Sequence, residues 1–290
     1  FETILSSQPG NYEARLELGH TLALSGQYNR ALETYGELAE AREARWRMAS
    51  SRWKGLTHLY RGEIAECLSE LEHLSDQARQ VSDLGGELFT TWYPGHIYTV
   101  LSQFGKANRA FLKALELAPD NFNILHLAGV MAAHQGDEGS LRYQVQDLEQ
   151  MVRQSGETSE MRRVYHLQAE VALLQEQPKK ALTEIGKALE LFDHPLYHET
   201  ADRINEAIDD PVAEEASYRR IVTSGDERLD IPLYYPKALF GLARTLDAQE
   251  KTDEALTYYE QFLSRWSEAS EPVPEMDEAK ARLRELNASR

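Results

Sequence analysis

The feature that most constrains this chain is a recurring spacing of small and large apolar residues, first seen between residues 12 and 45. The pattern begins with Leu18-Gly19, Leu22 and Gly26. A small residue, Ala31, comes next, and two larger residues, Tyr35 and Leu38, follow it. Residues three or four apart share one face of a helix, so residues 11–25 predict one amphipathic helix and the residues after Gly26 a second. A glycine where two helices cross lets them approach closely. The stretch therefore predicts a pair of packed helices.

The same spacing returns along the chain about every 34 residues. Small residues recur at the matching places, for example Gly55 and Cys67, Ala107 and Ala114, Ala169 and Ala181, and Ala255. In a repeat array each unit buries its core against its neighbours, so 290 residues need no single large core. The sequence predicts an all-α array of helix pairs.

These spacings, residue sizes and turn positions resemble those of the tetratricopeptide repeat (TPR) family. The resemblance implies a right-handed superhelical solenoid of antiparallel helix pairs, with first helices along a concave wall and a capping helix at the end. The stretch from about residue 221 to residue 286 also resembles the closing repeats of large bacterial signalling proteins, in which TPR arrays follow a kinase or transcription-regulator domain. That second resemblance implies a regulatory or scaffolding array in a bacterial protein.

We divide the chain by how well each stretch keeps the pattern. The expected parts are a second-helix remnant of a truncated repeat (1–10), five TPR-like repeats (12–195), a degenerate repeat or helical spacer (196–230), and a final repeat with a C-terminal capping helix (231–290). Pro94 lies where the inside of a helix is expected, so that helix either begins at Pro94 or is kinked there.

The charge balance narrows the class of partner. The chain has 31 Lys and Arg against 48 Asp and Glu, a net charge of −17. This balance argues against nucleic acid and favours a basic or neutral protein or peptide partner. No apolar run approaches the ~18 residues that span a bilayer, so no direct membrane insertion is expected.

The first residues read as the end of a repeat rather than as a signal peptide. We therefore expect the chain to be part of a longer protein or assembly. Its compartment stays open, with the cytoplasm slightly favoured.

Residues that could carry out chemistry are few. Cys67 is the one cysteine and is expected to be a small buried residue. His194 and His198 have a spacing found in metal sites, but Pro195 argues against both rings lying on one helix. The acidic pair Glu214–Glu215 is interpreted as solvated surface, and no phosphate loop, nucleophile elbow or zincin motif is present. The chain is predicted to be no enzyme, with no cofactor and no metal.

The repeat register predicts which first-helix side chains face the concave groove. The predicted partner-binding residues are Arg52, Leu56, Tyr60, Trp92, His96, His126, Val130, Arg163 and His166. The register places further residues on the same wall, namely Leu16, His20, Leu24, Val100, His134 and Glu170. Trp, Tyr and Arg are the side chains that most often anchor interfaces. The alternative is that some of these rings pack between repeats as ordinary core.

Two arginines form a separate candidate. Arg45 and Arg52 share one helical stripe and predict an anion pocket for a carboxylate or phosphate. The alternative is that they form salt bridges with nearby glutamates.

The sequence thus predicts a non-catalytic scaffold for protein–protein interaction that binds a peptide or helix of a partner in the concave groove. Two alternatives stay open. The chain could be the regulatory array of a larger bacterial enzyme, a kinase or transcription regulator whose catalytic domain lies upstream. It could also be a structural subunit that packs by its convex face in a multi-subunit complex.

Overall fold

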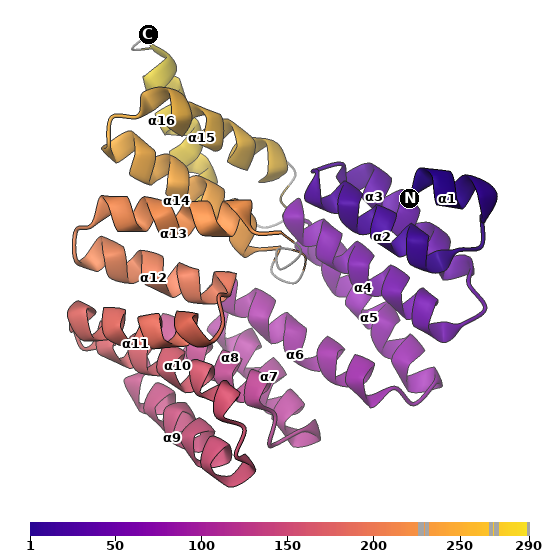
Figure 1. Ribbon diagram of the computed structural model, residues 1–290, viewed down its shortest axis with the longest axis horizontal. Helices are drawn as coiled ribbons and strands as arrows, with labels where there is room; N and C mark the ends of the chain where they lie inside the picture. Colours follow the sequence, from indigo (N-terminus) through magenta and orange to yellow (C-terminus); the bar gives the residue numbers. More distant parts are fainter. Residues whose placement is uncertain (226–228, 230–231, 267–268, 270–272, 289–290) are drawn as a thin grey trace. The chain divides into compact units, whose positions relative to one another are not determined.

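The computed structural model describes residues 1–225, 229, 232–266, 269 and 273–288, and in these residues it is helical, with no strand (Figure 1). The longer helices begin and end as follows: α1 (Glu2–Ser7), α2 (Tyr12–Leu24), α3 (Tyr28–Gly36), α4 (Ala44–Tyr60), α5 (Ile64–Gln80), α6 (Leu84–Val100), α7 (Phe104–Leu117), α8 (Phe122–Gln135), α9 (Glu138–Ser155), α10 (Met161–Leu174), α11 (Pro178–Leu191), α12 (Pro195–Ala207), α13 (Pro211–Thr223), α14 (Tyr234–Ala248), α15 (Thr252–Trp266) and α16 (Pro274–Ala288). Two short 3₁₀ helices lie at Glu37–Glu40 and Thr158–Glu160.

The helices form two compact units. The first unit combines Phe1–Thr90, Ser224–Phe240 and Leu256–Arg290, and the second combines Thr91–Thr223 and Gly241–Ala255. Within them successive helices pack in pairs, namely α2 with α3, α4 with α5, α8 with α9, α10 with α11 and α12 with α13 (Figure 1). The predicted all-α solenoid of helix pairs is confirmed.

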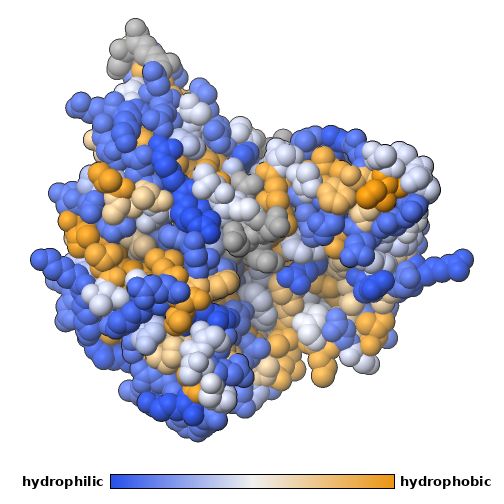
Figure 2. Space-filling model, viewed as in Figure 1, coloured by the Kyte–Doolittle hydropathy of each residue, from blue (hydrophilic) through white to orange (hydrophobic). Residues whose placement is uncertain are grey.

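Each unit has an apolar core where first and second helices meet. In the first unit Leu22, Tyr35 and Leu38 are buried, and Leu229 from the α13–α14 connection joins the same cluster. In the second unit the core is built from α8, α9 and α10, around residues such as Leu141 and Leu148. On the visible surface, hydrophobic residues are interspersed with hydrophilic ones (Figure 2). Among the described residues no helix has both the length and the apolar character that crossing a bilayer requires.

Close helix contact in the first repeat depends on Gly19. A Cβ atom added there would lie 2.7 Å from Cδ1 and 2.8 Å from Cζ of Tyr35, well inside normal carbon contact. The Tyr35 ring is fully buried, so it has no room to move aside. The close approach predicted from the spacing of small residues is therefore present between α2 and α3.

We expect Gly19→Ala to lower the stability of the protein by ~1–3 kcal/mol, because the added methyl group must displace a buried ring. The measurement is thermal or urea unfolding. The matched control is Gly36→Ala, since Gly36 is also helical and a Cβ atom added to it would meet no other atom within 4 Å. The control should be neutral or stabilise by up to ~1 kcal/mol, as Gly-to-Ala changes do in helices. Equal effects of the two changes would contradict this account of the contact.

Pro94 does not begin its helix. The helix α6 runs from Leu84 to Val100 with Pro94 inside it, so the expectation of a late start was wrong. The neighbouring Gly95 lies against the ring of Phe111 in α7, with a Cβ position only 3.0 Å from Cε1. The helix α6 therefore contains an interior proline, which is normally disfavoured, next to a residue that packs closely against α7.

Candidate functional site

A row of aromatic rings and arginines lies on one face of α2 and α4 in the first unit. We call it the aromatic face and define it as Tyr12, Arg45, Trp46, Arg52 and Trp53. The Tyr12 and Trp46 rings are 6.2 Å apart, centre to centre. The ring of Trp53 packs edge-on against that of His20 at 4.5 Å. Since α2 and α4 are the first helices of adjacent pairs, these two ring contacts join two repeats.

The arginines of this face lie over its rings. The Arg45 guanidinium is 4.6 Å from the centre of the Trp46 ring, and that of Arg52 is 5.2 Å from Trp53 and 4.4 Å from Phe89 of α6. Such cation–π contacts stabilise by ~0.5–2 kcal/mol. Arg45 is exposed and has no ion pair within the part of the chain that the structure describes. Each guanidinium lies on a different indole, and an anion pocket shared by Arg45 and Arg52 stays a prediction.

Several predicted groove residues are buried inside the protein. Those with 5% or less of their surface exposed are Leu56, Tyr60, His96, His126, Val130 and His166. Tyr60 illustrates the reason, because its ring stacks on Tyr28 at 5.5 Å and meets the edge of Tyr235 at 6.0 Å. A buried side chain cannot contact a partner without rearrangement, so we do not retain these residues as a binding surface. Their positions on the first helices are those of core residues that pack between neighbouring helices.

Three predicted residues keep partial exposure: Arg52, Trp92 and Arg163. Trp92 lies in α6 with its ring centre 5.3 Å from that of Tyr93. Arg163 lies in α10, where its Nε donates to a Glu160 carboxylate oxygen at 2.6 Å. Arg52 is the member of this group that belongs to the aromatic face.

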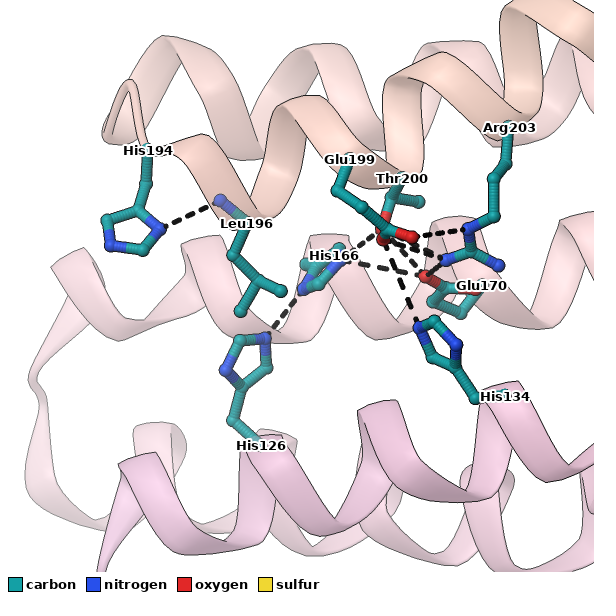
Figure 3. A network of polar contacts seen from close by, with 9 residues as sticks. All are labelled: His126, His134, His166, Glu170, His194, Leu196, Glu199, Thr200 and Arg203. Atoms are coloured by element: carbon teal, nitrogen blue, oxygen red, sulfur yellow. Dashed lines mark hydrogen bonds and ion pairs between the residues drawn. The ribbon is translucent and has the colours of Figure 1, made fainter. Parts of the chain in front are cut away.

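A buried polar network joins α8, α10 and α12 in the second unit (Figure 3). His126 Nε2 and His166 Nδ1 are 2.7 Å apart, and His166 Nε2 lies 2.7 Å from the Thr200 hydroxyl. That hydroxyl donates to Glu170 Oε1 at 2.7 Å. Arg203 donates to the same carboxylate and pairs with Glu199, whose oxygen lies 3.9 Å from His134 Nε2. One hydrogen-bonded chain thus crosses three successive first helices.

The donor at one end of this hydrogen-bond network determines the tautomers of His126 and His166. Arg163 Nη1 can only donate, and it lies 3.3 Å from His126 Nδ1, so that nitrogen accepts and Nε2 carries the proton. His126 then donates to His166 Nδ1, and His166 Nε2 donates to Thr200. Every ring nitrogen of the two histidines is engaged, which leaves none for a metal or a partner.

Burial keeps these histidines neutral. It lowers the pKa of His166 to about 4, with a partial opposing effect from Glu170. Burial, followed by the charges of His166 and Arg163, lowers the pKa of His126 well below its usual value. For Glu170, burial alone would raise the pKa, but Arg203 and His166 bring it down to about 2. At neutral pH the network therefore holds two neutral imidazoles beside an ionised carboxylate–guanidinium pair.

Acid is expected to destabilise the protein through His166. Its pKa is about 4 when folded and ~6.5 when unfolded. The unfolded chain therefore takes up a proton first, and stability falls as pH drops from 6.5 to 4. We expect His166→Gln to reduce this loss by ~2–3 kcal/mol, at 1.36 kcal/mol per pKa unit.

The measurement is urea unfolding of wild type and variant at pH 6.5 and pH 4. Comparing the change in unfolding free energy between the two pH values removes any effect of the substitution that does not depend on pH. The exposed His73 of α5 serves as the control for loss of an imidazole, since surface substitutions change stability by less than ~0.5 kcal/mol. A His166→Gln curve parallel to that of the wild type would contradict a neutral buried imidazole.

Two buried acids beside the network were missed. Asp202 of α12 is 1% exposed, and neither of its carboxyl oxygens has a hydrogen-bond partner among the described residues. Burial, and then the charges of Glu199 and Glu214, raise the pKa of Asp202 to about 10. The Ser217 hydroxyl acts weakly in the opposite direction and donates to the Ala213 carbonyl at 3.2 Å.

The interpretation of Glu214 as solvated surface was wrong. Its side chain is buried and accepts from the Thr245 hydroxyl at 2.9 Å, and burial raises its pKa. Glu215, one residue on, pairs at the surface with Arg219 and Lys251, each at 2.7 Å. On a helix, adjacent residues point in different directions, so only one of two neighbouring acids faced the core.

The His194 and His198 rings contact different partners. His194 Nδ1 accepts from the backbone N–H of Leu196 at 3.2 Å and so caps the start of α12 (Figure 3). His198 Nε2 lies 2.6 Å from an Asp193 carboxylate oxygen. No group of three or more His, Cys, Asp or Glu in the described residues could hold a metal ion. Cys67 is fully buried, as predicted, and burial raises the pKa of its thiol.

Comparisons with known proteins bear on the fold. Residues 238–268 match the model of the tetratricopeptide repeat. Yeast Tom70 has a similar structure, with a TM-score of 0.52 and 17% identity over 99% of this chain and 57% of the Tom70 chain. A tetratricopeptide repeat protein from Parabacteroides merdae gives a TM-score of 0.50 and 14% identity, over 95% of this chain and 98% of that one.

The chain spans a little more than half of the Tom70 chain that it matches. No curated protein sequence matches it. Identities this low show the fold alone, and the repeat spacing, the packed helix pairs and the matched residues agree on which fold it is. The chain carries a tetratricopeptide repeat at residues 238–268, and its fold is that of the tetratricopeptide repeat proteins.

Proposed function

We propose that this protein is a non-catalytic scaffold for protein–protein interaction and that the aromatic face of α2 and α4 binds a segment of a partner. The observation that carries the proposal is the row of half-buried rings Tyr12, Trp46 and Trp53 with arginines stacked on two of them. Half-exposed Trp, Tyr and Arg are the side chains that contribute most at interfaces.

The chemistry of the face indicates what it would bind. Rings held by neighbouring rings, such as Trp53 against His20, lose little conformational freedom when an apolar side chain packs on them. An exposed guanidinium over an indole, as at Arg45, can also receive a carboxylate without losing its cation–π contact. We therefore expect a segment in which an aromatic or aliphatic side chain lies next to an acidic one.

The test is selection of peptides from a random display library, followed by fluorescence anisotropy of the selected peptides. We expect acidic and apolar residues to be enriched. We also expect Arg45→Glu combined with Trp46→Ala to weaken binding at least tenfold, which is ~1.4 kcal/mol or more. Arg52 and Trp53 are left unchanged because they are more tightly packed.

The matched control is Arg109→Glu in α7, an exposed arginine of the second unit. It changes the net charge by the same amount as Arg45→Glu and should leave binding within twofold. Thermal unfolding of each variant separates lost binding from lost folding. Unchanged affinity of a folded double variant would refute the site, and enrichment of basic peptides would refute the proposed partner.

A further inference from the structure

A separate hollow lies in the second unit, between α9, α10 and α11. Its volume is about 300 Å³ and its lining comprises Arg142, Val145, Gln146, Gln168, Val171, Lys180 and Glu184. Hollows of this size are at the small end of those that bind ligands. In α10, Gln168 and Val171 lie on a different face from His166 and Glu170, because five residues turn a helix by ~140°. The hollow is therefore distinct from the buried network.

The floor of the hollow is apolar and its rim is polar. Val171 is 8% exposed and Val145 is half-buried. Gln168 is held in place by donating to Glu149 at 2.8 Å. An aliphatic chain of a few carbons would cover the two valines and keep its polar end at the rim.

The rim carries two cations, of which Arg142 is ion-paired with Glu138 and Lys180 has no ion pair among the described residues. Glu184 is paired with Lys187, with both of its oxygens within 2.9 Å of Nζ. Arg142 forms an ion pair with Glu138 through Nε at 2.8 Å, while its Nη1 and Nη2 make no hydrogen bond with the described residues. Lys180 belongs to the first turn of α11, which has no acidic residue. In a protein of net charge −17, two cations beside an apolar floor favour an anionic ligand.

We infer that this hollow is a second binding site, for an acidic peptide segment of a partner, with a glutamate side chain whose methylenes lie on Val145 and Val171. Its carboxylate accepts hydrogen bonds from Arg142 and Lys180. The site goes beyond the aromatic face, since it lies in the other unit and selects a carboxylate on a flexible chain rather than an aromatic anchor.

The probe is a fluorescein-labelled peptide, acetyl-Ala-Glu-Leu-Glu-Ala-amide, measured by anisotropy beside the matched peptide with Gln in place of Glu. We expect the Glu peptide to bind at least tenfold more tightly than the Gln peptide and to weaken as salt is raised from 50 to 300 mM. We expect Arg142→Gln with Lys180→Gln to reduce affinity at least tenfold. Both residues are exposed, so the fold should persist.

The matched control is Arg109→Gln with Lys113→Gln, which removes two exposed cations from α7 and should change affinity less than twofold. Glu-peptide binding that survives Arg142→Gln with Lys180→Gln would overturn the inference, as would equal binding of the Gln peptide or no binding by the wild type. Loss of binding on Arg45→Glu with Trp46→Ala instead would place the peptide on the aromatic face. That result would support the proposed function and refute this second site.

Discussion

Asp202→Asn is expected to stabilise the protein by ~1–3 kcal/mol at pH 7. The folded protein keeps Asp202 protonated up to a pKa of about 10, whereas the unfolded chain releases that proton near pH ~3.9. Stability therefore falls as pH rises from about 4 towards 10, because only the folded state must hold the proton. An amide of the same shape does not titrate and removes this cost.

The size of the effect follows from the difference between pH 7 and the pKa of Asp202 in the unfolded chain. About three pH units at 1.36 kcal/mol each give an upper limit of ~4 kcal/mol. Part of this gain is offset because an asparagine buries two N–H donors instead of one hydroxyl, and an unpaired buried donor costs ~1–3 kcal/mol.

Urea unfolding at pH 4 and at pH 7 checks this prediction. The asparagine should give no advantage at pH 4, and its effect on stability should become more favourable as pH rises to 7. The exposed Asp120 provides a control, and Asp120→Asn should stay within ~0.5 kcal/mol at both values. If Asp202→Asn destabilised the protein equally at both pH values, Asp202 would have to be ionised and paired in the native state.

Glu170→Leu is expected to destabilise the protein by ~3–5 kcal/mol. Glu170 is 1% exposed and accepts from both Thr200 and Arg203. Removing the buried carboxylate takes away the main partner of the Arg203 guanidinium, whose side chain is 30% exposed, and this is more costly than losing the pair as a whole. Glu199 still contacts Arg203, but its carboxylate is more exposed and compensates only in part.

A second substitution tests this explanation. Glu170→Leu combined with Arg203→Met should recover most of the lost stability, because no uncompensated charge stays buried. Thermal unfolding of the two single variants and the double variant completes the cycle. Glu116→Leu on the exposed side of α7 is the control and should have little effect. A double variant less stable than Glu170→Leu would show that the cost comes from packing rather than from the unpaired guanidinium.

The helical periodicity predicted the pairs well because it is a local property. Gly19 was predicted to lie where the two helices approach most closely, and the structure places it against the Tyr35 ring of α3. Pro94 shows where a local rule fails, since the expectation that its helix begins there was wrong and it lies inside α6. The ring of Phe111, sixteen residues later in the chain, packs against the adjacent Gly95.

The candidate sites were harder to predict. The register placed His126 and His166 correctly on first helices, but not their burial, which depends on partners 34 to 40 residues away. Thr200 and Arg203 belong to a stretch where the repeat pattern is weak, so the register assigned them no role. The Glu199–Arg203 spacing of four residues was the available signal, because such pairs meet on one helical face.

By itself the sequence determined that this protein is an array of packed helix pairs, because the period and the sizes of its apolar residues are readable within one repeat. The tertiary structure alone decided which polar side chains are buried, which acids stay protonated and which rings reach the surface. The physical reason is that burial and pKa depend on neighbours from adjacent repeats. Those neighbours are set by packing across tens of residues rather than by the local pattern.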